Sequence, residues 1–363
     1  MRRTALLVGV AALSACVAMP RATPSETCRS TPQFAFACGA TKPEDLAALP
    51  GTGWIVASGF APGAGLKIVD SRTRRVRFWF SGAAAQVAPD PRYPDCATPP
   101  DPALFTARGI SLRVTGPGQA RLLVVNHGGR EAIEVFAVDF GQKERTPLLR
   151  WQGCLAMPAG HVANSVASYS DGTVITTVLT RPGTTITDFV LGRDTGGVYE
   201  RAAGEAAFRL LPGTDLPGNN GLETARDDSG FYVIAFGRRE VVAYDRRATQ
   251  QPLWRAQASD FMPDNIHWDG DRLLLAGMAR DEPACGGVRQ IVDGVADGMA
   301  CHRGWTVAQL DPATRRFVLI ARGPRDPVFN GVSAAVILGR QLWLGSYQAD
   351  RIAIHPLPKN GMN

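Results

Sequence analysis

Short apolar segments separated by turns recur along most of the chain. Each unit starts with a strand-like apolar segment and continues, after a turn or loop, with an alternating segment that often ends in an acidic residue. Period-two alternation between turn residues is typical of β-hairpins. The pattern predicts six hairpins, formed by residues 54–57 with 66–70, 121–126 with 133–139, 173–178 with 197–200, 231–235 with 240–245, 272–276 with 305–311, and 341–345 with 351–355.

The spacing of these hairpins predicts the fold. Their first strands begin at positions 54, 121, 173, 231, 272 and 341, so that successive hairpins start 41 to 69 residues apart. Such intervals suit four-stranded propeller blades with loops of unequal length. A β-sandwich is the alternative, but it gives no reason for six similar hairpins along the whole chain. We therefore predict an all-β fold, a six-bladed β-propeller, in one domain over residues 34–363.

Composition supports this prediction and excludes several classes of protein. Glycine (39) and proline (26) make up 65 of 363 residues without a short period, which favours many turns between short strands. With 45% hydrophobic and 20% charged residues, the chain is neither disordered, collagenous nor a coiled coil. The net charge of +6 comes from 39 basic and 33 acidic residues spread along the chain, so nucleic acid is not an expected partner.

The N-terminus has the pattern of an export signal. Two arginines precede an apolar run at 5–13 that is too short to remain as a membrane-spanning helix. The sequence Leu-Ser-Ala-Cys at 13–16 resembles the lipobox of bacterial lipoproteins. We expect a signal peptide at 1–15 and a lipidated Cys16 with a tether at 16–33, which would anchor the protein in the cell envelope facing the periplasm. The alternative is ordinary cleavage and a secreted soluble protein.

Cysteine usage agrees with an oxidising compartment. Six of the seven cysteines remain after Cys16, an even number that allows three disulfides in fifteen possible pairings. Proximity in the sequence favours Cys28 with Cys38, Cys96 with Cys154, and Cys285 with Cys301. A zinc site is the alternative, but no CxxC pair or Cys/His spacing supports it.

Polar residues near the predicted inner strands are candidates for a metal site. The loops and strand ends around a propeller's central channel bring groups from every blade to one axis. The candidates all carry oxygen donors, and they are Glu44, Asp45, Asn164, Asn219, Asn220, Asp264 and Asn265. Such a set suits Ca²⁺, although Asp and Asn commonly cap turns as well.

At these same residues the chain resembles the calcium-dependent serum paraoxonase and arylesterase family, which is allied to the gluconolactonase-type six-bladed propellers. The resemblance is carried in order by residues 43–50, 108–111, 122–127, 163–167, 220–222 and 264–266. It implies a catalytic Ca²⁺ held by Glu44, Asn164, Asn220, Asp264 and Asn265. It also implies a second, structural Ca²⁺ at Asp45 and the carbonyl of Ile110, but the remaining carboxylate of that site falls on Ser165.

The resemblance fails at residues that would transfer protons. The family's His-Gly-Ile-Ser motif begins here with Arg108, whose guanidinium cannot act as a base. The second histidine of the family's pair survives as His127, and a further histidine aligns with Met278. Arg108 would bind a substrate anion or an oxyanion, or would alternatively pair with Glu44 or Asp45 as a structural substitute.

The resemblance implies hydrolysis of carboxylic esters or lactones, with the metal polarising the carbonyl and water as nucleophile. His127 would be the base or orienting group and Arg108 the anion partner. The alternative is a catalytically reduced, metal-bound propeller that acts as a ligand-binding or scaffold lipoprotein. We expect a monomer whose partner is a small ester or lactone, either neutral or anionic.

Other candidates carry less of the argument. His161 has the pattern of a surface loop residue and His267 that of a core or supporting residue. Ser111 and Ser333 lack the Gly-x-Ser-x-Gly nucleophile elbow, which disfavours a serine hydrolase. The Gly-rich insertion at 281–304 either covers the substrate opening or is only a surface turn.

Overall fold

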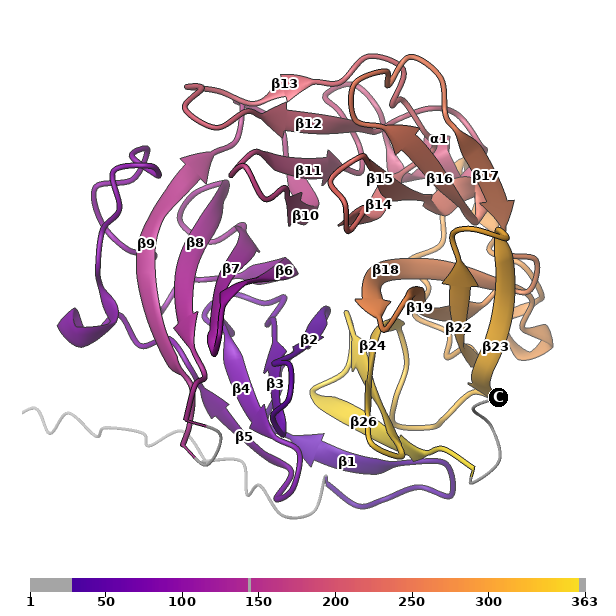
Figure 1. The fold of residues 1–363 in the computed structure, drawn as a ribbon. Coiled ribbons are helices and arrows are strands. Elements are labelled where there is room, and N and C mark those ends of the chain that lie inside the picture. The colour runs from indigo at the N-terminus through magenta and orange to yellow at the C-terminus, as the bar shows by residue number, and fades with distance from the viewer. Residues whose placement is uncertain (1–27, 143–144, 359–363) are drawn as a thin grey trace, which may run out of the picture.

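Six four-stranded antiparallel sheets are arranged around a central axis in the computed structural model, which describes residues 28–142 and 145–358 (Figure 1). Almost all regular structure in this part of the chain is β. The predicted all-β, six-bladed propeller is confirmed. The predicted signal peptide and Cys16 lie outside the described residues.

Each blade is named here from the axis outward. The first three blades are β2 (Leu46–Ala48), β3 (Trp54–Ala57), β4 (Lys67–Asp70) and β5 (Arg75–Phe78); β6 (Ala107–Gly116), β7 (Gln119–Asn126), β8 (Ala132–Asp139) and β9 (Leu148–Ala156); and β10 (Ala163–Ser168), β11 (Val174–Val178), β12 (Gly197–Arg201) and β13 (Arg209–Leu210). The other three are β14 (Asn219–Thr224), β15 (Gly230–Ala235), β16 (Glu240–Asp245) and β17 (Trp254–Gln257); β18 (Phe261–Asp269), β19 (Arg272–Ala279), β22 (Trp305–Asp311) and β23 (Arg316–Gly323); and β24 (Val332–Leu338), β25 (Gln341–Ser346), β26 (Arg351–Pro356) and β1 (Ala35–Cys38).

The last blade joins the two ends of the described chain. Strand β1 pairs antiparallel with β26, with Phe36 opposite Ala353, so the N-terminal strand completes the C-terminal blade (Figure 1). This pairing closes the ring and leaves no unpartnered gap between the first and last sheets.

The predicted hairpins are real, but they occupy a different place in the blades. They form the middle two strands of each sheet, such as β3 with β4 and β15 with β16, and a further strand lies between each hairpin and the axis. The true inner strands are missed because they start with polar residues, as in Asn219–Thr224, or are as short as Leu46–Ala48. An apolar alternation pattern does not detect such segments.

Apolar side chains pack between neighbouring blades, as expected for sheets that cover each other on both faces. Val56 and Ile68 of the first blade share one cluster with Leu122 and Phe136 of the second. The predicted disulfide pairs are all confirmed, and they are Cys28–Cys38, Cys96–Cys154 and Cys285–Cys301.

The remaining elements are short. They are α1 (Ile186–Val190), the 3₁₀ turns η1 (Ala84–Gln86), η2 (Phe236–Arg238) and η3 (Pro283–Cys285), and a small hairpin of β20 (Ile291–Val292) and β21 (Val295–Ala296). This hairpin lies inside the loop closed by the Cys285–Cys301 disulfide, and Ala296 N–H donates to Thr187 Oγ1 of α1 at 2.9 Å. Within the described part of the chain, no helix has the length and apolar character needed to cross a membrane.

Candidate functional site

Irregular pairing at the start of the inner strands positions the predicted ligands. The register between β10 and β11 breaks between Ala163 and Val166, and similar breaks begin β6, β14 and β18. The residues skipped by these breaks include Arg108, Asn164, Asn220, Asp264 and Asn265. A β-bulge leaves residues unpaired and turns their side chains away from the regular alternation. Adjacent residues such as Asp264 and Asn265 can therefore both face the axis.

Two glycines allow the inner strands to approach one another at this level. A Cβ on Gly109 would lie 2.5 Å from the carbonyl oxygen of Asn164, and one on Gly221 would lie 2.6 Å from that of Asp264. Both distances are shorter than any side chain tolerates, so the backbone contact requires glycine. The strands that carry the ligands are thus packed directly against each other.

The five predicted calcium ligands are all buried around the axis, and we call them the mouth cluster: Glu44, Asn164, Asn220, Asp264 and Asn265. Four of their oxygens are buried without a hydrogen-bond partner: Glu44 Oε2, Asn164 Oδ1, Asn220 Oδ1 and Asn265 Oδ1. Buried polar atoms are nearly always paired in folded proteins, so four orphaned oxygens in one cluster are a donor set that fits a cation.

Backbone contacts hold this cluster in place. The Glu44 carbonyl accepts hydrogen bonds from Asn265 Nδ2 at 3.1 Å and from Ser333 Oγ at 2.6 Å. The Asn220 carbonyl accepts one from Thr177 Oγ1 at 2.7 Å. Ser333, which the sequence excludes as a nucleophile, therefore has a supporting role here.

The electrostatics of the cluster also favour a bound cation. Burial raises the pKa values of both Glu44 and Asp264 above their ordinary range, and their carboxylates also repel each other. Two carboxylates and three amide oxygens are a donor set that suits Ca²⁺. Among the described residues, no group of three or more His, Cys, Asp and Glu side chains could hold a metal, so such a site depends on the asparagines. We conclude that the mouth cluster fits a calcium ion.

The second predicted calcium site does not fit an ion. Asp45 Oδ1 accepts from Leu46 N–H at 2.8 Å and lies 2.7 Å from His267 Nε2, and Oδ2 accepts from Ile110 N–H at 2.9 Å. Ser165 supplies no charge, and its Oγ accepts from Leu222 N–H at 3.2 Å. The carboxylate is therefore already satisfied by protein donors.

His267 supplies the positive charge beside Asp45. Burial alone would lower the pKa of His267, but the carboxylates of Asp45 and Glu223 outweigh it and raise the pKa to about 10. Its Nδ1 lies 3.8 Å from Glu223 Oε2, so the imidazolium stands between two acids. We had assigned His267 only to the core or a supporting position, and the structure gives it this specific contact.

Arg108 lies at the edge of the mouth cluster. Its Nε is 3.7 Å from Glu44 Oε1 and has no hydrogen-bond partner. The guanidinium carbon stands 4.7 Å from the ring centroid of Phe60. Of the two carboxylates considered from the sequence, Arg108 therefore lies beside Glu44, in a loose ion pair that leaves donors for another anion.

His127 lies near Arg108 and has a carboxylate partner. Its backbone N–H donates to the carbonyl of Thr106, directly before β6, and its ring packs edge-on against Phe60 at 5.8 Å between centroids. His127 Nδ1 lies 2.9 Å from Glu131 Oε2. Because an ionised carboxylate only accepts hydrogen bonds, Nδ1 is assigned a proton, and in the neutral form of the ring Nε2 is then an acceptor. That Nε2 is buried and has no partner.

The other sequence candidates are placed away from this arrangement or lack its chemistry. Met278 lies opposite Met262 in the β18–β19 pair, and its sulfur accepts from Tyr347 Oη at 3.7 Å. His161 contacts the ring of Tyr199 and the carbonyl of Ala159 in a loop.

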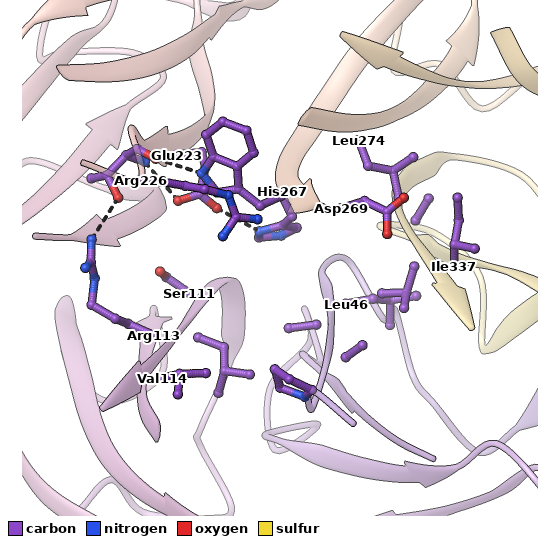
Figure 2. Close-up of a pocket in the computed structure, with 18 of the residues that line it drawn as sticks. Leu46, Ser111, Arg113, Val114, Glu223, Arg226, His267, Asp269, Leu274 and Ile337 are labelled. Carbon is purple, nitrogen blue, oxygen red and sulfur yellow. Dashed lines mark hydrogen bonds and ion pairs between the residues drawn. The ribbon is translucent and has the colours of Figure 1, made fainter. Parts of the chain in front are cut away.

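The other end of the inner strands opens into a cavity of about 390 Å³. Figure 2 shows Ser111, Glu223 and His267 among the side chains that line it, with the Glu223–His267 contact drawn as a dashed line. Arg113 at its wall is engaged by Asp228 at 2.8 Å. This end therefore contains mainly satisfied polar groups.

Sequence reasoning missed Glu131, Phe60 and Tyr347. Glu131 follows His127 by four residues across two glycines, a spacing that allows a turn to bring the two side chains together. This was the one available signal. Phe60 and Tyr347 had none, since an aromatic residue in a loop after a strand has no distinctive pattern.

Comparison with known proteins supports the fold. The sequence matches no protein-family model and no curated protein. A solved luciferin-regenerating enzyme superposes with a TM-score of 0.51 at 13% identity, over 90% of this chain and 94% of that one. A calcium-binding regucalcin from Agrobacterium tumefaciens superposes with a TM-score of 0.50 at 10% identity, over 90% and 93% of the two chains. At this identity the likeness establishes a shared fold, and the resemblance to paraoxonases stays a prediction.

Proposed function

We propose that this protein is a calcium-dependent hydrolase of carboxylic esters or lactones. The observation that carries the proposal is the mouth cluster, whose four orphaned buried oxygens come from three inner strands and the Glu44 loop. The calcium-binding regucalcin of the same fold is compatible with this proposal. A bound Ca²⁺ would polarise the substrate carbonyl and stabilise the oxyanion.

His127 is the base in this proposal. Glu131 fixes the imidazole with its proton on Nδ1, so that Nε2 can take a proton from the attacking water. In this proposal, the His127–Glu131 pair takes the place of the family's histidine pair, of which this chain keeps only His127. Arg108 donates to the oxyanion or to an anionic group of the substrate from beside Glu44.

The test is hydrolysis of phenyl acetate, an aliphatic δ-lactone and gluconolactone by the purified protein, with calcium and with excess EGTA. We expect turnover of at least one substrate that EGTA abolishes. His127→Gln should lower kcat by about 100-fold, as for loss of a general base, without changing calcium affinity. Arg108→His should raise turnover of the aryl ester because it restores a second imidazole.

A metal-bound ligand-binding scaffold is the alternative function, and it is favoured by Arg108 and Met278, which stand where the resembled family has histidines. A folded protein that binds calcium but hydrolyses none of the three substrates would contradict the hydrolase proposal and support the scaffold.

A further inference from the structure

A small cavity of about 170 Å³ is lined by three arginines and by apolar side chains. Its lining includes Arg239, Arg280 and Arg289, with Phe236, Met262 and Val288. These residues come from blades four and five and from the loop closed by the Cys285–Cys301 disulfide.

The cavity lies on the same end of the ring as the mouth cluster. Phe236 N–H donates to the Gly218 carbonyl, directly before Asn219 and Asn220 on β14. Met262 precedes Asp264 by two residues on β18, and two strand residues span about 7 Å. A ligand that reaches from the metal site toward blades four and five therefore meets this cavity.

Two of the three guanidinium groups have no counter-charge. Within the described residues, no carboxylate lies within ion-pairing distance of Arg239 or Arg280, and Arg239 Nε is buried without a hydrogen-bond partner. Arg239 and the exposed Arg280 line the same cavity, and burial together with the charge of Arg280 lowers the pKa of Arg239. Arg289, in contrast, is engaged by Asp297 at 3.3 Å. Close, unpaired guanidinium groups are a ready site for an oxyanion.

Arg238 provides an internal contrast. It precedes Arg239 in the chain, but its Nη2 lies 3.2 Å from Asp194 Oδ1 and donates to the Gly192 carbonyl. It does not line the cavity. The unpaired state of Arg239 is therefore not a general property of arginines in this turn.

A buried apolar cluster adjoins the cavity. Phe236, Met262 and Met278 belong to one buried cluster, against which Tyr347 packs. Tyr347 Oη donates to Met278 Sδ of this cluster at 3.7 Å, and burial raises the pKa of Tyr347. Phe236 and Met262 belong to this cluster and also line the cavity, so an aromatic ring and a thioether lie beside the arginines.

We infer that Arg239 and Arg280 form an anion subsite, and that the substrate is an ester or lactone that carries a terminal carboxylate or phosphate separated from its reacting carbonyl by an apolar segment. The inference rests on the proposed hydrolase function and names its substrate class. The carbonyl lies at the mouth cluster, the apolar segment along Met262 and Phe236, and the anion at the two arginines.

A matched pair of substrates tests this inference. Mono-4-nitrophenyl adipate and 4-nitrophenyl hexanoate have acyl chains of equal length and differ only in the terminal carboxylate. We expect the wild-type protein to prefer the adipate ester, and the variant Arg239→Gln with Arg280→Gln to lose about 10- to 100-fold in kcat/KM for it, mostly through KM. Turnover of the hexanoate ester should be unchanged. Arg238→Gln is the control and should behave as wild type toward both esters.

A binding measurement separates this inference from the proposed function. Adipate and inorganic phosphate are titrated calorimetrically into the calcium-loaded protein and its variants, and the two anions distinguish carboxylate from phosphate recognition. Binding by wild type and by Arg238→Gln, but not by Arg239→Gln or by the exposed Arg280→Gln alone, supports the subsite even when no ester is hydrolysed. Hydrolysis of both esters at equal kcat/KM, with no anion bound, would overturn the subsite and leave the hydrolase proposal intact.

Discussion

Glu44 and Asp45 are consecutive buried carboxylates with opposite surroundings. Glu44 has an oxygen without any hydrogen-bond partner among the described residues, and the guanidinium Nε of Arg108 is 3.7 Å from its other oxygen. Asp45 uses both oxygens, for two backbone N–H groups and for His267 Nε2 at 2.7 Å. A difference of one position in the chain therefore separates a carboxylate left open for a ligand from one built into the framework.

The same contrast holds between the mouth cluster and the group formed by Asp45, His267 and Glu223. The mouth cluster contains four orphaned oxygens, whereas the His267 imidazolium lies between the carboxylates of Asp45 and Glu223. A cation supplied by the chain is permanent, but a bound ion can be exchanged and can contact a substrate. In our proposal the mouth cluster binds a metal, whereas Asp45, His267 and Glu223 stabilise the fold. Mutations in the two groups should therefore have different effects.

The largest effect should come from removing the charge of the mouth cluster. Glu44→Gln keeps the size of the side chain but removes one of two carboxylates, so calcium affinity should fall by at least about 100-fold. Isothermal titration calorimetry measures this, and melting with and without EGTA should show that calcium no longer stabilises the variant. The control is Glu131→Gln, which changes a carboxylate already paired with His127 and should leave affinity unaltered. Wild-type affinity in Glu44→Gln would show that the mouth cluster is not the calcium site.

Removing the charge of His267, beside Asp45 and Glu223, should lower the stability of the fold instead of calcium affinity. His267→Asn removes the cation between Asp45 and Glu223 and leaves a buried carboxylate uncompensated. The free energy of unfolding should fall by about 3 kcal/mol, near the low end for such pairs because the imidazole is partly exposed. Urea denaturation in EGTA measures the loss. An unchanged unfolding midpoint would mean that Asp45 does not need His267, and the contrast with Glu44 would fail.

The metal content sharpens the same contrast. Wild-type protein should bind one Ca²⁺ per chain, because Asp45 is satisfied and Ser165 offers no charge. Inductively coupled plasma mass spectrometry of protein dialysed against calcium gives the stoichiometry. Two ions per chain would show that calcium displaces His267 from Asp45.

A smaller effect is expected where the strands meet. The Cβ of Gly221→Ala would lie 2.6 Å from the Asp264 carbonyl oxygen and 2.9 Å from Asn265 Cα, so β18 must move away. Calcium affinity should fall about tenfold, the effect of a loss of about 1.4 kcal/mol. Gly298→Ala, whose Cβ meets no atom within 4 Å, is the matched control. Equal affinities for the two variants would show that ligand placement tolerates strand movement.

The β-bulges at the start of the inner strands could not be predicted from the sequence pattern. Short apolar segments correctly predicted β3 and β15, and alternation predicted β4 and β16, because these middle strands of the blades are largely buried. The inner strands β10, β14 and β18 break their register at the ligands, and alternation cannot represent two adjacent side chains on one face. The ligand candidates in those segments were selected as polar residues beside predicted strands, and the resemblance then gave them their roles.

Contacts between distant residues were also beyond the sequence. His267 reaches Asp45 across 222 positions, and no local pattern encodes that distance. The sequence shows that Arg108 stands where the resembled family has a histidine, and Ser165 where it has a carboxylate. The consequences depend on which donors surround Glu44 and Asp45. The disulfides were predictable because two of the three close short loops, of 10 and 16 residues in separation.

The smallest predicted effect concerns Arg108, the cation beside Glu44 of the mouth cluster, as His267 is the cation beside Asp45. Its Nε is 3.7 Å from Glu44, compared with 2.7 Å between His267 Nε2 and Asp45, so it screens the carboxylate without occupying it. Arg108→Gln removes a positive charge near the ion and should raise calcium affinity by up to about tenfold, or ~1.4 kcal/mol. Titration in low and high salt checks that the gain is electrostatic, since salt should reduce it. A fall in affinity would instead mean that Arg108 positions Glu44, and the two cations would then have the same structural role.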